Sequence, residues 1–294
     1  MTGGVALIDV PTLAGQLASG DPPTLIDVRW RLGGPPGLEG YLAGHIPTAV
    51  FLDLDTDLCG PPGAGGRHPL PDPAALQERL RAAGVRAGHP VVAYDAGDGM
   101  PAARLWWTLR WAGHEAVAVL DGGLAAWLAD GQATQVGPVT PEPGDVVVDP
   151  GHMPILDAPA AARLARDGVL LDARAPVRYR GEAEPVDPVA GHIPGAVNLP
   201  SSTLVDDSGR LRPPDQLREA VQAAAQQDRA STPVFGAYCG SGVTAAQTVL
   251  ALELAGYPRS PLYVGSWSEW VADASRPVAV GEERVGDDTA GQRP

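Results

Sequence analysis

The 294-residue chain contains one series of short motifs twice, and this repeat constrains its fold more than any other feature. Four markers of the first half return in the same order in the second half, at offsets of 145, 147, 144 and 143 residues. The pairs are Asp27 and Asp172, Gly44-His-Ile-Pro47 and Gly191-His-Ile-Pro194, Ala93-Tyr-Asp95 and Ala237-Tyr-Cys239, and Trp127 and Trp270. A nearly constant offset predicts a tandem duplication, that is, two domains with one fold.

Each half alternates short apolar segments with stretches of helical periodicity, which predicts an α/β fold with a mainly parallel sheet flanked by helices in each domain. In the first half we expect strands at Val5–Ile8, Thr24–Val28, Val50–Leu52, Pro90–Tyr94 and Val117–Leu120. We expect helices at Pro11–Ala18, Pro73–Ala83, Met100–Trp111 and Gly123–Ala129. The repeat predicts a first domain at residues 1–135, a Pro/Gly-rich linker at 136–150, a second domain at 151–281 and a flexible tail at 282–294.

Cys239 lies between a predicted strand, Pro233–Tyr238, and a predicted helix, Val243–Ala255. There its sulfur faces free backbone N–H groups and the positive end of the helix dipole, and both favour a thiolate. The loop of Gly240, Ser241 and Gly242 can curl its amides around an anion. A free cysteine is also a common inert core residue, but this one follows the apolar run, at the strand end where open α/β sheets bind ligands. We therefore interpret Cys239 as a functional residue.

The first half has Asp95 at the position equivalent to Cys239. An aspartate cannot act as a thiol nucleophile, so we expect only the second half to be catalytic. The first domain is then expected to form one wall of the site.

Composition excludes several classes of function. The formal net charge of −14 argues against nucleic acid or an anionic membrane as a partner. All 21 basic residues are arginine, which excludes a Schiff-base lysine and a P-loop lysine. Two cysteines, Cys59 and Cys239, provide neither a disulfide scaffold nor metal-ligand spacing, so we expect a cytoplasmic protein with no metal and no cofactor.

Two other motif interpretations compete with a sulfur nucleophile. Gly240-Ser-Gly-Val-Thr-Ala245 fits the dinucleotide fingerprint G-x-G-x-x-A. This fingerprint also requires an acidic residue about 20 residues later, at the end of the next strand, and that residue is missing. Glu253 comes too early, and the strand predicted at Leu262–Val264 ends in Gly265. A cysteine phosphatase needs an arginine six residues after its nucleophile, and Ala245 stands there.

The remaining candidates are single side chains. His45 and His192 occupy matching places in the two halves, so we interpret His192 as structural and leave open whether His45 is structural or faces the cleft between the domains. Arg178 and Arg180 follow the strand expected before them and are candidates to bind an anion near Cys239.

Three further features receive structural interpretations. Asp53–Asp57 is interpreted as a turn, because the glycine of a calcium-binding loop is replaced by Leu58. Cys59 is interpreted as an incidental free thiol. Asp27 with Arg29, and Asp172 with Arg174, are expected to be repeated ion pairs at strand ends.

From Val5 to about Val280 the sequence resembles the tandem-domain sulfurtransferases, that is, rhodaneses and 3-mercaptopyruvate sulfurtransferases. The resemblance depends on the Asp-x-Arg strands, the two Gly-His-Ile-Pro turns, Arg178-Tyr-Arg-Gly181 and Cys239-Gly-Ser-Gly-Val-Thr244. It implies two tandem rhodanese-like domains, and a persulfide carried by Cys239 in a loop that includes Gly240, Ser241, Gly242, Val243 and Thr244. It also implies a small-molecule sulfur donor, a thiol or cyanide acceptor, and Arg178 as the residue that binds the donor.

The resemblance also bears on the donor. Thiosulfate enzymes of this family tend to have Arg and Lys after the cysteine, whereas mercaptopyruvate enzymes have Gly and Ser, as at Gly240 and Ser241. Mercaptopyruvate enzymes often carry a second arginine before the second Gly-His-Ile-Pro turn, where this chain has Glu184–Ala190. We expect 3-mercaptopyruvate as donor, with thiosulfate as the alternative, and a persulfide carrier or binding module as the alternative without catalysis.

Overall fold

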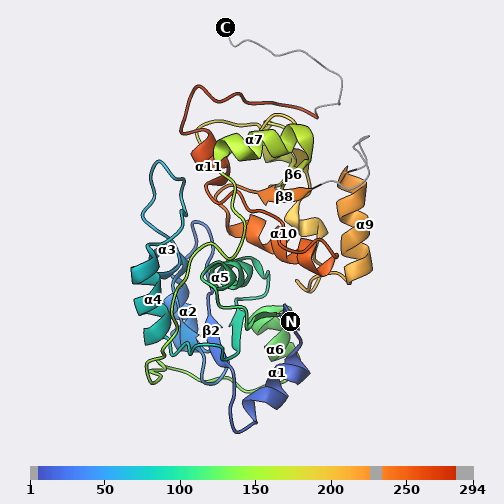
Figure 1. Cartoon of the computed structure of the whole chain (residues 1–294). Coiled ribbons are helices and arrows are strands. Elements are labelled where there is room, and N and C mark those ends of the chain that lie inside the picture. Colours follow the sequence, from blue (N-terminus) through green and yellow to red (C-terminus); the bar gives the residue numbers. More distant parts are fainter. Residues whose placement is uncertain (1–5, 226–233, 283–294) are drawn as a thin grey trace.

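The computed structural model describes residues 6–225 and 234–282 and contains two parallel sheets, each with helices on both faces (Figure 1). In the first domain the strand order is β1-β5-β4-β2-β3. Its strands are β1 (Leu7–Ile8), β2 (Thr24–Asp27), β3 (Val50–Phe51), β4 (Val91–Tyr94) and β5 (Val117–Leu120). Its helices are α1 (Val10–Leu17), α2 (Gly37–Ala43), α3 (Leu54–Asp57), α4 (Pro73–Ala82), α5 (Met100–Trp111) and α6 (Gly123–Ala129).

The second domain has a sheet in the order β7-β6-β8. Its strands are β6 (Val169–Asp172), β7 (Val197–Asn198) and β8 (Phe235–Tyr238), and its helices are α7 (Ala158–Asp167), α8 (Pro176–Tyr179), the 3-10 helix η1 (Ser201–Thr203), α9 (Pro214–Ala225), α10 (Val243–Leu254) and α11 (Ser266–Trp270). Single parallel bridges extend the sheet from Ala237 to Leu262 and from Leu262 to Ile155. The strand predicted at Leu262–Val264 is therefore reduced to one bridged residue. With these bridges, the order matches that of the first sheet.

Side chains alternate between the two faces of the first sheet along its strands, and this alternation shows which helices cover each face. Leu25, Val92 and Tyr94 point to the core that contains α1 and α6. Ile26 and Ala93, next to them in the chain, point to the core that contains α4 and α5. Both sides of the sheet are thus covered, as expected for an all-parallel sheet.

The strand registers confirm the duplication. Asp27 pairs with Tyr94 between β2 and β4, and Asp172 pairs with Tyr238 between β6 and β8. Asp95 and Cys239, the residues that follow these tyrosines, therefore occupy equivalent positions.

The repeated ion pairs are also confirmed and fasten the two Gly-His-Ile-Pro turns. The Arg29 guanidinium binds Asp27 at 2.5 Å and donates to the Gly44 carbonyl at 2.8 Å. In the second domain Arg174 binds Asp172 at 2.6 Å and donates to the Gly191 carbonyl at 2.7 Å. Each pair therefore connects the end of a central strand to the turn beside it.

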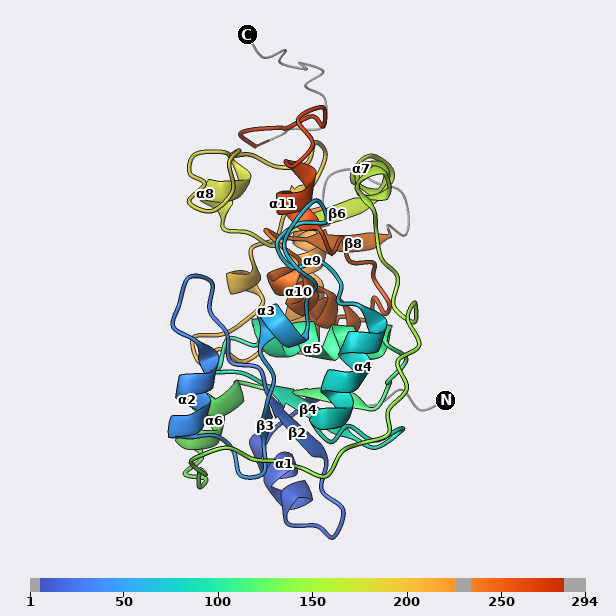
Figure 2. The same ribbon diagram turned by 90° about the vertical axis from the view of Figure 1, so that its left-hand side faces the viewer.

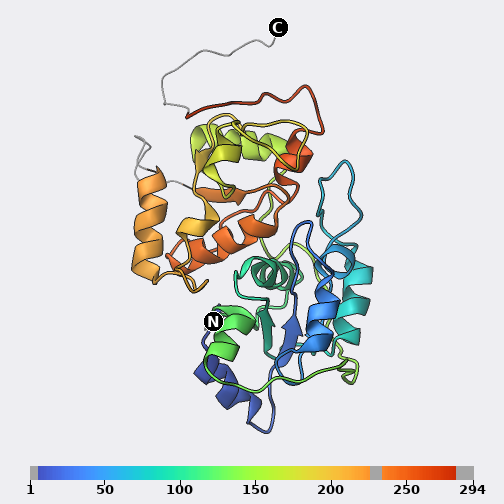
Figure 3. The same cartoon turned by 180° about the vertical axis from the view of Figure 1, so that it is seen from behind.

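Helices α5 and α10 pack against each other where the two domains meet, and α9 packs beside α10 at the flank of the second domain (Figures 1 and 3). One hydrophobic core runs through this contact, because Trp106 and Trp107 of α5 share a cluster with Val249 and Leu250 of α10. The two domains thus share apolar surface that neither buries alone.

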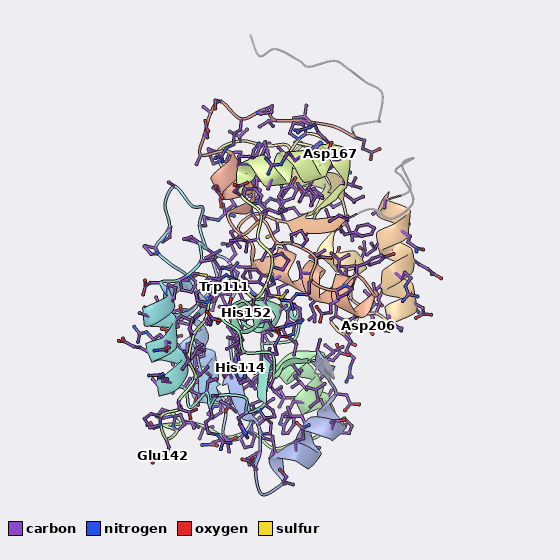
Figure 4. The ribbon with its side chains drawn as sticks, viewed as in Figure 1. Trp111, His114, Glu142, His152, Asp167 and Asp206 are labelled. Carbon is purple, nitrogen blue, oxygen red and sulfur yellow. The ribbon has the colours of Figure 1, made fainter. Side chains whose placement is uncertain are left out.

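The segment between α6 and α7 follows the surface of the first domain before it enters the second. In Figure 4 it runs from Glu142, at the far end of the first domain, to His152, near Trp111 at the end of α5. Backbone bonds fasten it: Gly144 N–H donates to the Arg81 carbonyl at 2.7 Å, and His152 N–H donates to the Trp111 carbonyl at 3.2 Å. The domain boundaries stay predictions, and residues 283–294 of the predicted tail lie outside the described residues.

One local prediction is wrong. Asp53–Asp57 is not a simple turn, because residues Leu54–Asp57 form the short helix α3. The Asp53 side chain caps this helix by accepting from the N–H groups of Asp55 and Thr56 at 2.9 and 3.0 Å. This cap fixes the backbone of Asp55, whose side chain takes part in the candidate active site described below. Among the described helices, none is long and apolar enough to cross a membrane.

We predict that Asp172→Asn lowers the free energy of unfolding by about 3 kcal/mol, because it leaves the buried Arg174 guanidinium without its main counter-charge. Urea unfolding measures the change. The matched control is Glu182→Gln, which breaks an ion pair with Arg180 at the surface and leaves stability unchanged within error. Equal stability of Asp172→Asn and wild type would contradict the structural role of the repeated pair.

Candidate active site

Cys239 lies at the carboxyl end of β8, where the following loop folds back over its sulfur. The Gly242 N–H donates to Cys239 Sγ at 3.1 Å, and Gly242 takes a left-handed φ of 82°, which glycine adopts without strain. The Cys239 N–H donates to Ser266 Oγ at 3.1 Å. The sulfur is therefore held by a backbone donor at the N-terminus of α10, as an anionic sulfur requires.

The side chain of Cys239 is buried and lines a cavity of about 310 Å³ between the two domains. The first domain contributes Trp30, Arg67 and Met100 to the walls, and the second contributes Arg178, Ser241 and Thr244. A cavity of this size accepts a small molecule. Both domains are therefore needed to form it.

A hydrogen-bonded chain leads from this cavity toward solvent. Ser241 Oγ lies 2.7 Å from His68 Nδ1, and His68 Nε2 lies 3.0 Å from Asp55 Oδ1. Asp55 also accepts from the indole N–H of Trp30 at 2.9 Å and is half-exposed in a second hollow of about 350 Å³. With Nε2–H donating to Asp55, Nδ1 accepts the Ser241 proton, so the three residues can move a proton out of the cavity.

The imidazole of His68 is neutral at pH 7. Burial is the largest cause that lowers the pKa of His68, to about 4, and the nearby guanidinium groups of Arg104 and Arg67 lower it further. The Asp55 carboxylate acts in the opposite direction. A neutral ring keeps Nδ1 available as an acceptor for Ser241.

Two arginines, Arg67 and Arg178, reach the cavity beside Gly240. A side chain at position 240 would begin 2.8 Å from Arg67 Nη2 and 3.6 Å from Arg178 Nη2, so a larger residue there would displace the Arg67 guanidinium. Glu184 binds Arg178 at 2.6 and 3.0 Å, and the Asp187 carboxylate bridges Arg178 and Arg67. Burial raises the pKa of Asp187, and the Arg67 guanidinium opposes this.

A third arginine, Arg104 of α5, lies beneath the Cys239 loop and is fully buried. It donates to the Gly242 carbonyl at 3.3 Å and to the His68 carbonyl at 3.1 Å. Cys59 Sγ lies 4.0 Å from the same guanidinium, and burial raises the pKa of this thiol. Cys59 is thus a buried neutral thiol.

The structure brings Arg178, Gly240, Ser241, Val243 and Thr244 together with Cys239 around the cavity, and their roles in binding stay predictions. Gly242 contributes its N–H. The other two candidates, Arg180 and His45, lie outside the cavity.

Arg180 does not reach the cavity: it caps α8, binds the exposed Glu182 and borders a different hollow. His45 does not face the cleft either. It is fully buried in the first domain, stacks on Tyr41 at 4.1 Å and bonds the Tyr41 carbonyl through Nδ1. Its counterpart His192 stacks in the same way on Tyr179.

Sequence reasoning missed Arg67, His68, Asp55 and Arg104, all from the first domain. The clearest available signal was the dipeptide Arg67-His68 in a Gly/Pro-rich loop, because long loops of this composition often carry functional residues. Arg104, flanked by apolar residues within the helix of Met100–Trp111, was a second signal, since an unpaired charge in such a position is costly.

In the first domain, Asp95 fills the equivalent of the sulfur cradle. Its carboxylate accepts from the N–H groups of Gly97, Gly99 and Ala102 at 2.9 to 3.1 Å. Burial raises the pKa of Asp95 to about 7, with a further contribution from Asp98. A side chain of the protein thus occupies the place where a second sulfur would lie.

The comparisons with known proteins agree with this architecture. A family model described as Rhodanese-like domain matches residues 10–130 and 157–273. A Pseudomonas aeruginosa protein named as a 3-mercaptopyruvate sulfurtransferase is 46% identical over 282 residues, covering 94% of this chain and 98% of its own. A Mycobacterium tuberculosis protein named as a thiosulfate sulfurtransferase, SseB, is 45% identical over 284 residues, covering 95% and 98%.

Among solved structures, the 3-mercaptopyruvate sulfurtransferase SseA from Escherichia coli matches with a TM-score of 0.77 at 30% identity, over 90% of this chain and 99% of its own. The chain belongs to the rhodanese and 3-mercaptopyruvate sulfurtransferase family. This assignment favours a sulfurtransferase over the dinucleotide-binding and phosphatase interpretations.

The pKa of His68 predicts a pH dependence of stability. Its folded pKa of about 4 lies below the ordinary value of 6.5, so the unfolded chain binds more protons between these values, and stability falls as pH drops from 6.5 to 4. Over this window we expect wild type to lose on the order of 2–3 kcal/mol more than His68→Gln. Urea unfolding at several pH values tests this, and parallel pH profiles for the two proteins would contradict it.

Proposed function

We propose that the chain is a sulfurtransferase that moves a sulfane sulfur from 3-mercaptopyruvate, through a persulfide on Cys239, to a thiol or cyanide acceptor. The observation that carries the proposal is the position of Cys239 Sγ, which accepts an N–H from its own loop at the wall of an interdomain cavity. The 46% identity to a protein with the mercaptopyruvate name supports the donor.

In the first half-reaction the Cys239 thiolate attacks the donor's sulfur. A sulfur–sulfur bond forms while the donor's carbon–sulfur bond breaks, and the electron pair of that bond leaves as the pyruvate enolate. The proton lost by the donor's thiol is taken up by the enolate carbon, giving pyruvate. The persulfide anion stays on Cys239, where the loop N–H groups stabilise it.

The proton transfer is assigned to Ser241, His68 and Asp55. Neutral His68 accepts the Ser241 proton while Ser241 takes the proton of the donor's thiol, and the reverse movement delivers a proton to the enolate. In the second half-reaction the acceptor thiolate or cyanide attacks the outer sulfur, and the bond to Cys239 breaks to regenerate the thiolate.

The donor's carboxylate is assigned to the arginine side of the cavity, near Arg178, and Gly240 to Thr244 form the loop that carries the sulfur. Thiosulfate is the second candidate donor, favoured by the relative named SseB and by the two guanidinium groups beside Gly240. Because Glu184 and Asp187 offset these cations, the site suits a single carboxylate better than a dianion.

The proposal includes the cellular location and the partners. With a net charge of −14 and two free thiols, the chain fits a reducing cytoplasm, with neither nucleic acid nor membrane as partner. The donor and acceptor are small molecules.

We predict that Cys239→Ser lowers sulfur transfer by at least about four orders of magnitude, because the nucleophile is lost. Cys59→Ala, which removes the other thiol, retains activity. Steady-state turnover with 3-mercaptopyruvate and cyanide measures both. Turnover that survives Cys239→Ser would refute the mechanism, and one sulfur bound to Cys239 without turnover would favour a persulfide carrier.

We also predict that kcat/KM is higher with 3-mercaptopyruvate than with thiosulfate, and that Ser241→Ala lowers kcat with 3-mercaptopyruvate about 100-fold through loss of the proton relay. Arg178→Ala lowers kcat/KM for this donor. Steady-state kinetics of wild type and both variants with the two donors provide the measurement. If wild type prefers thiosulfate, the proposed donor is wrong, while the proposed role of Cys239 as the nucleophile still holds.

A further inference from the structure

We propose that Arg104, an arginine of α5 that is buried where the two domains meet, is a positioning residue for the sulfur of Cys239. Its hydrogen bonds hold the loop of Cys239 in the form that binds an anionic sulfur, and its charge stabilises that anion. The inference rests on the proposed function in one respect, the role of Cys239 as nucleophile. It goes beyond that function because it applies to the thiolate and to the persulfide, whichever donor supplies the sulfur.

Arg104 lies at the contact between the domains. Helix α5 packs against α10, and the loop between α3 and α4 reaches past α5 toward α11 of the second domain (Figures 1 and 2). The Arg104 side chain is fully buried, and its guanidinium carbon lies 5.8 Å from the centre of the Trp107 ring. Because an arginine does not lose its proton on burial, a full positive charge is enclosed there.

The guanidinium joins the loop of the nucleophile to the loop of the proton relay. Nη1 donates to the Gly242 carbonyl at 3.3 Å, and Nη2 donates to the His68 carbonyl at 3.1 Å. A side chain at Gly242 would begin 2.8 Å from Arg104 Nη1 and 2.5 Å from the Val264 carbonyl oxygen, so this glycine is held between the two. The Gly242 N–H, which donates to Cys239 Sγ at 3.1 Å, therefore has a fixed direction.

Arg104 has no counter-ion of its own. Within residues 6–225 and 234–282 no carboxylate forms an ion pair with it, and its buried Nε has no hydrogen-bond partner. The side chains beside it are neutral: the Cys59 thiol lies 4.0 Å from Nη2, and the His68 imidazole is uncharged at pH 7. An isolated buried cation destabilises a fold, and a negative charge on Cys239, in the loop that Arg104 supports, offsets it.

The other arginines around the cavity face carboxylates. The ion pairs are those of Arg67 with Asp187, of Arg174 with Asp172, and of Arg178 with Glu184 and Asp187. Arg31 acts on Asp98: burial raises the pKa of this carboxyl, and the Arg31 guanidinium opposes the rise. The charges of these arginines are thus offset before a sulfur anion forms, whereas the charge of Arg104 is not.

The first test measures how fast iodoacetamide alkylates Cys239 over a range of pH, in a Cys59→Ala background that leaves one thiol. Only the thiolate reacts, so the midpoint of the profile reports the stability of the anion. In Arg104→Met we expect the midpoint to rise by at least about one pH unit, which is a tenfold loss. Arg104→Gln, which is neutral but can still donate to a carbonyl, is expected to show the same rise, and Arg104→Lys, which keeps the charge, less than half of it.

Arg110→Met is the matched control. Arg110 lies on the same helix and binds Glu253 of α10 across the same interface at 2.5 Å, so its loss also removes a contact between the domains. Because Arg110 does not bond the loop of Cys239, the midpoint of alkylation is expected to stay at the wild-type value. A rise equal to that of Arg104→Met would show that the interface as a whole, and not the charge of Arg104, sets the midpoint.

The second test is a thermodynamic cycle in urea unfolding, which needs neither donor nor reagent. Arg104→Met is made in wild type and in Cys239→Ser, at a pH above the wild-type midpoint. Without an anion at position 239 the buried cation is uncompensated, so its removal is expected to favour folding at least about tenfold more in Cys239→Ser than in wild type. Arg104→Gln repeats the cycle, which keeps the test decisive if one neutral variant does not fold.

Steady-state kinetics separate this role from donor binding. The neutral variants are expected to lower kcat/KM for 3-mercaptopyruvate and for thiosulfate by the same factor, and the loss shrinks as pH rises past their midpoint, because the thiolate then forms without the cation. An unchanged alkylation midpoint in both neutral variants, or equal changes of unfolding in the two backgrounds, would overturn the proposal. If wild type turns over neither donor, the proposed function fails, and alkylation and unfolding still decide the role of Arg104.

Discussion

The hydrogen bonds of Arg104 connect the loop around Cys239 to the loop that carries His68. This fully buried guanidinium of the first domain donates to the carbonyl of Gly242, in the loop around Cys239, and to the carbonyl of His68, in the proton relay. Within the described residues no carboxylate pairs with it. A buried cation without a counter-ion is costly, and an anion on Cys239 lies in the loop that this cation supports. We therefore expect an anionic sulfur on Cys239 and the Arg104 guanidinium to stabilise one another.

The arrangement also shows what the first domain, which has Asp95 in place of a cysteine, contributes to the site. In the first domain the Asp95 carboxylate accepts the N–H groups of its loop, so these groups are not available to bind a sulfur atom. The same domain supplies Arg67, His68 and Arg104 to the other cradle. In the proposed mechanism the second domain provides the nucleophile, its loop, Arg178 and Ser241. The first domain provides Arg67, Arg104 and the His68 and Asp55 part of the proton relay. Because α5 and α10 share one core, the two sets are held at fixed distances.

The sequence predicted the duplication, the parallel sheets and the place of Cys239 because these depend on local signals: apolar runs, repeated motifs and a cysteine at a strand end. It also predicted the repeated pairs of Asp27 and Asp172 with arginine. It did not predict Arg67, whose acid partner Asp187 is 120 positions away in the chain. Such a contact depends on how two domains pack, and no local pattern encodes it. The sequence does not determine whether His45 faces the cleft for the same reason, since a motif shows that a residue recurs and not which way its side chain points.

The most direct test of the account is the mass of the peptides that contain Cys239 and Cys59 after one equivalent of 3-mercaptopyruvate, without acceptor. The account predicts one added sulfur atom on Cys239, none on Cys59, and one pyruvate released for each sulfur bound. Pyruvate released without sulfur on Cys239, or sulfur found on Cys59 instead, would contradict it.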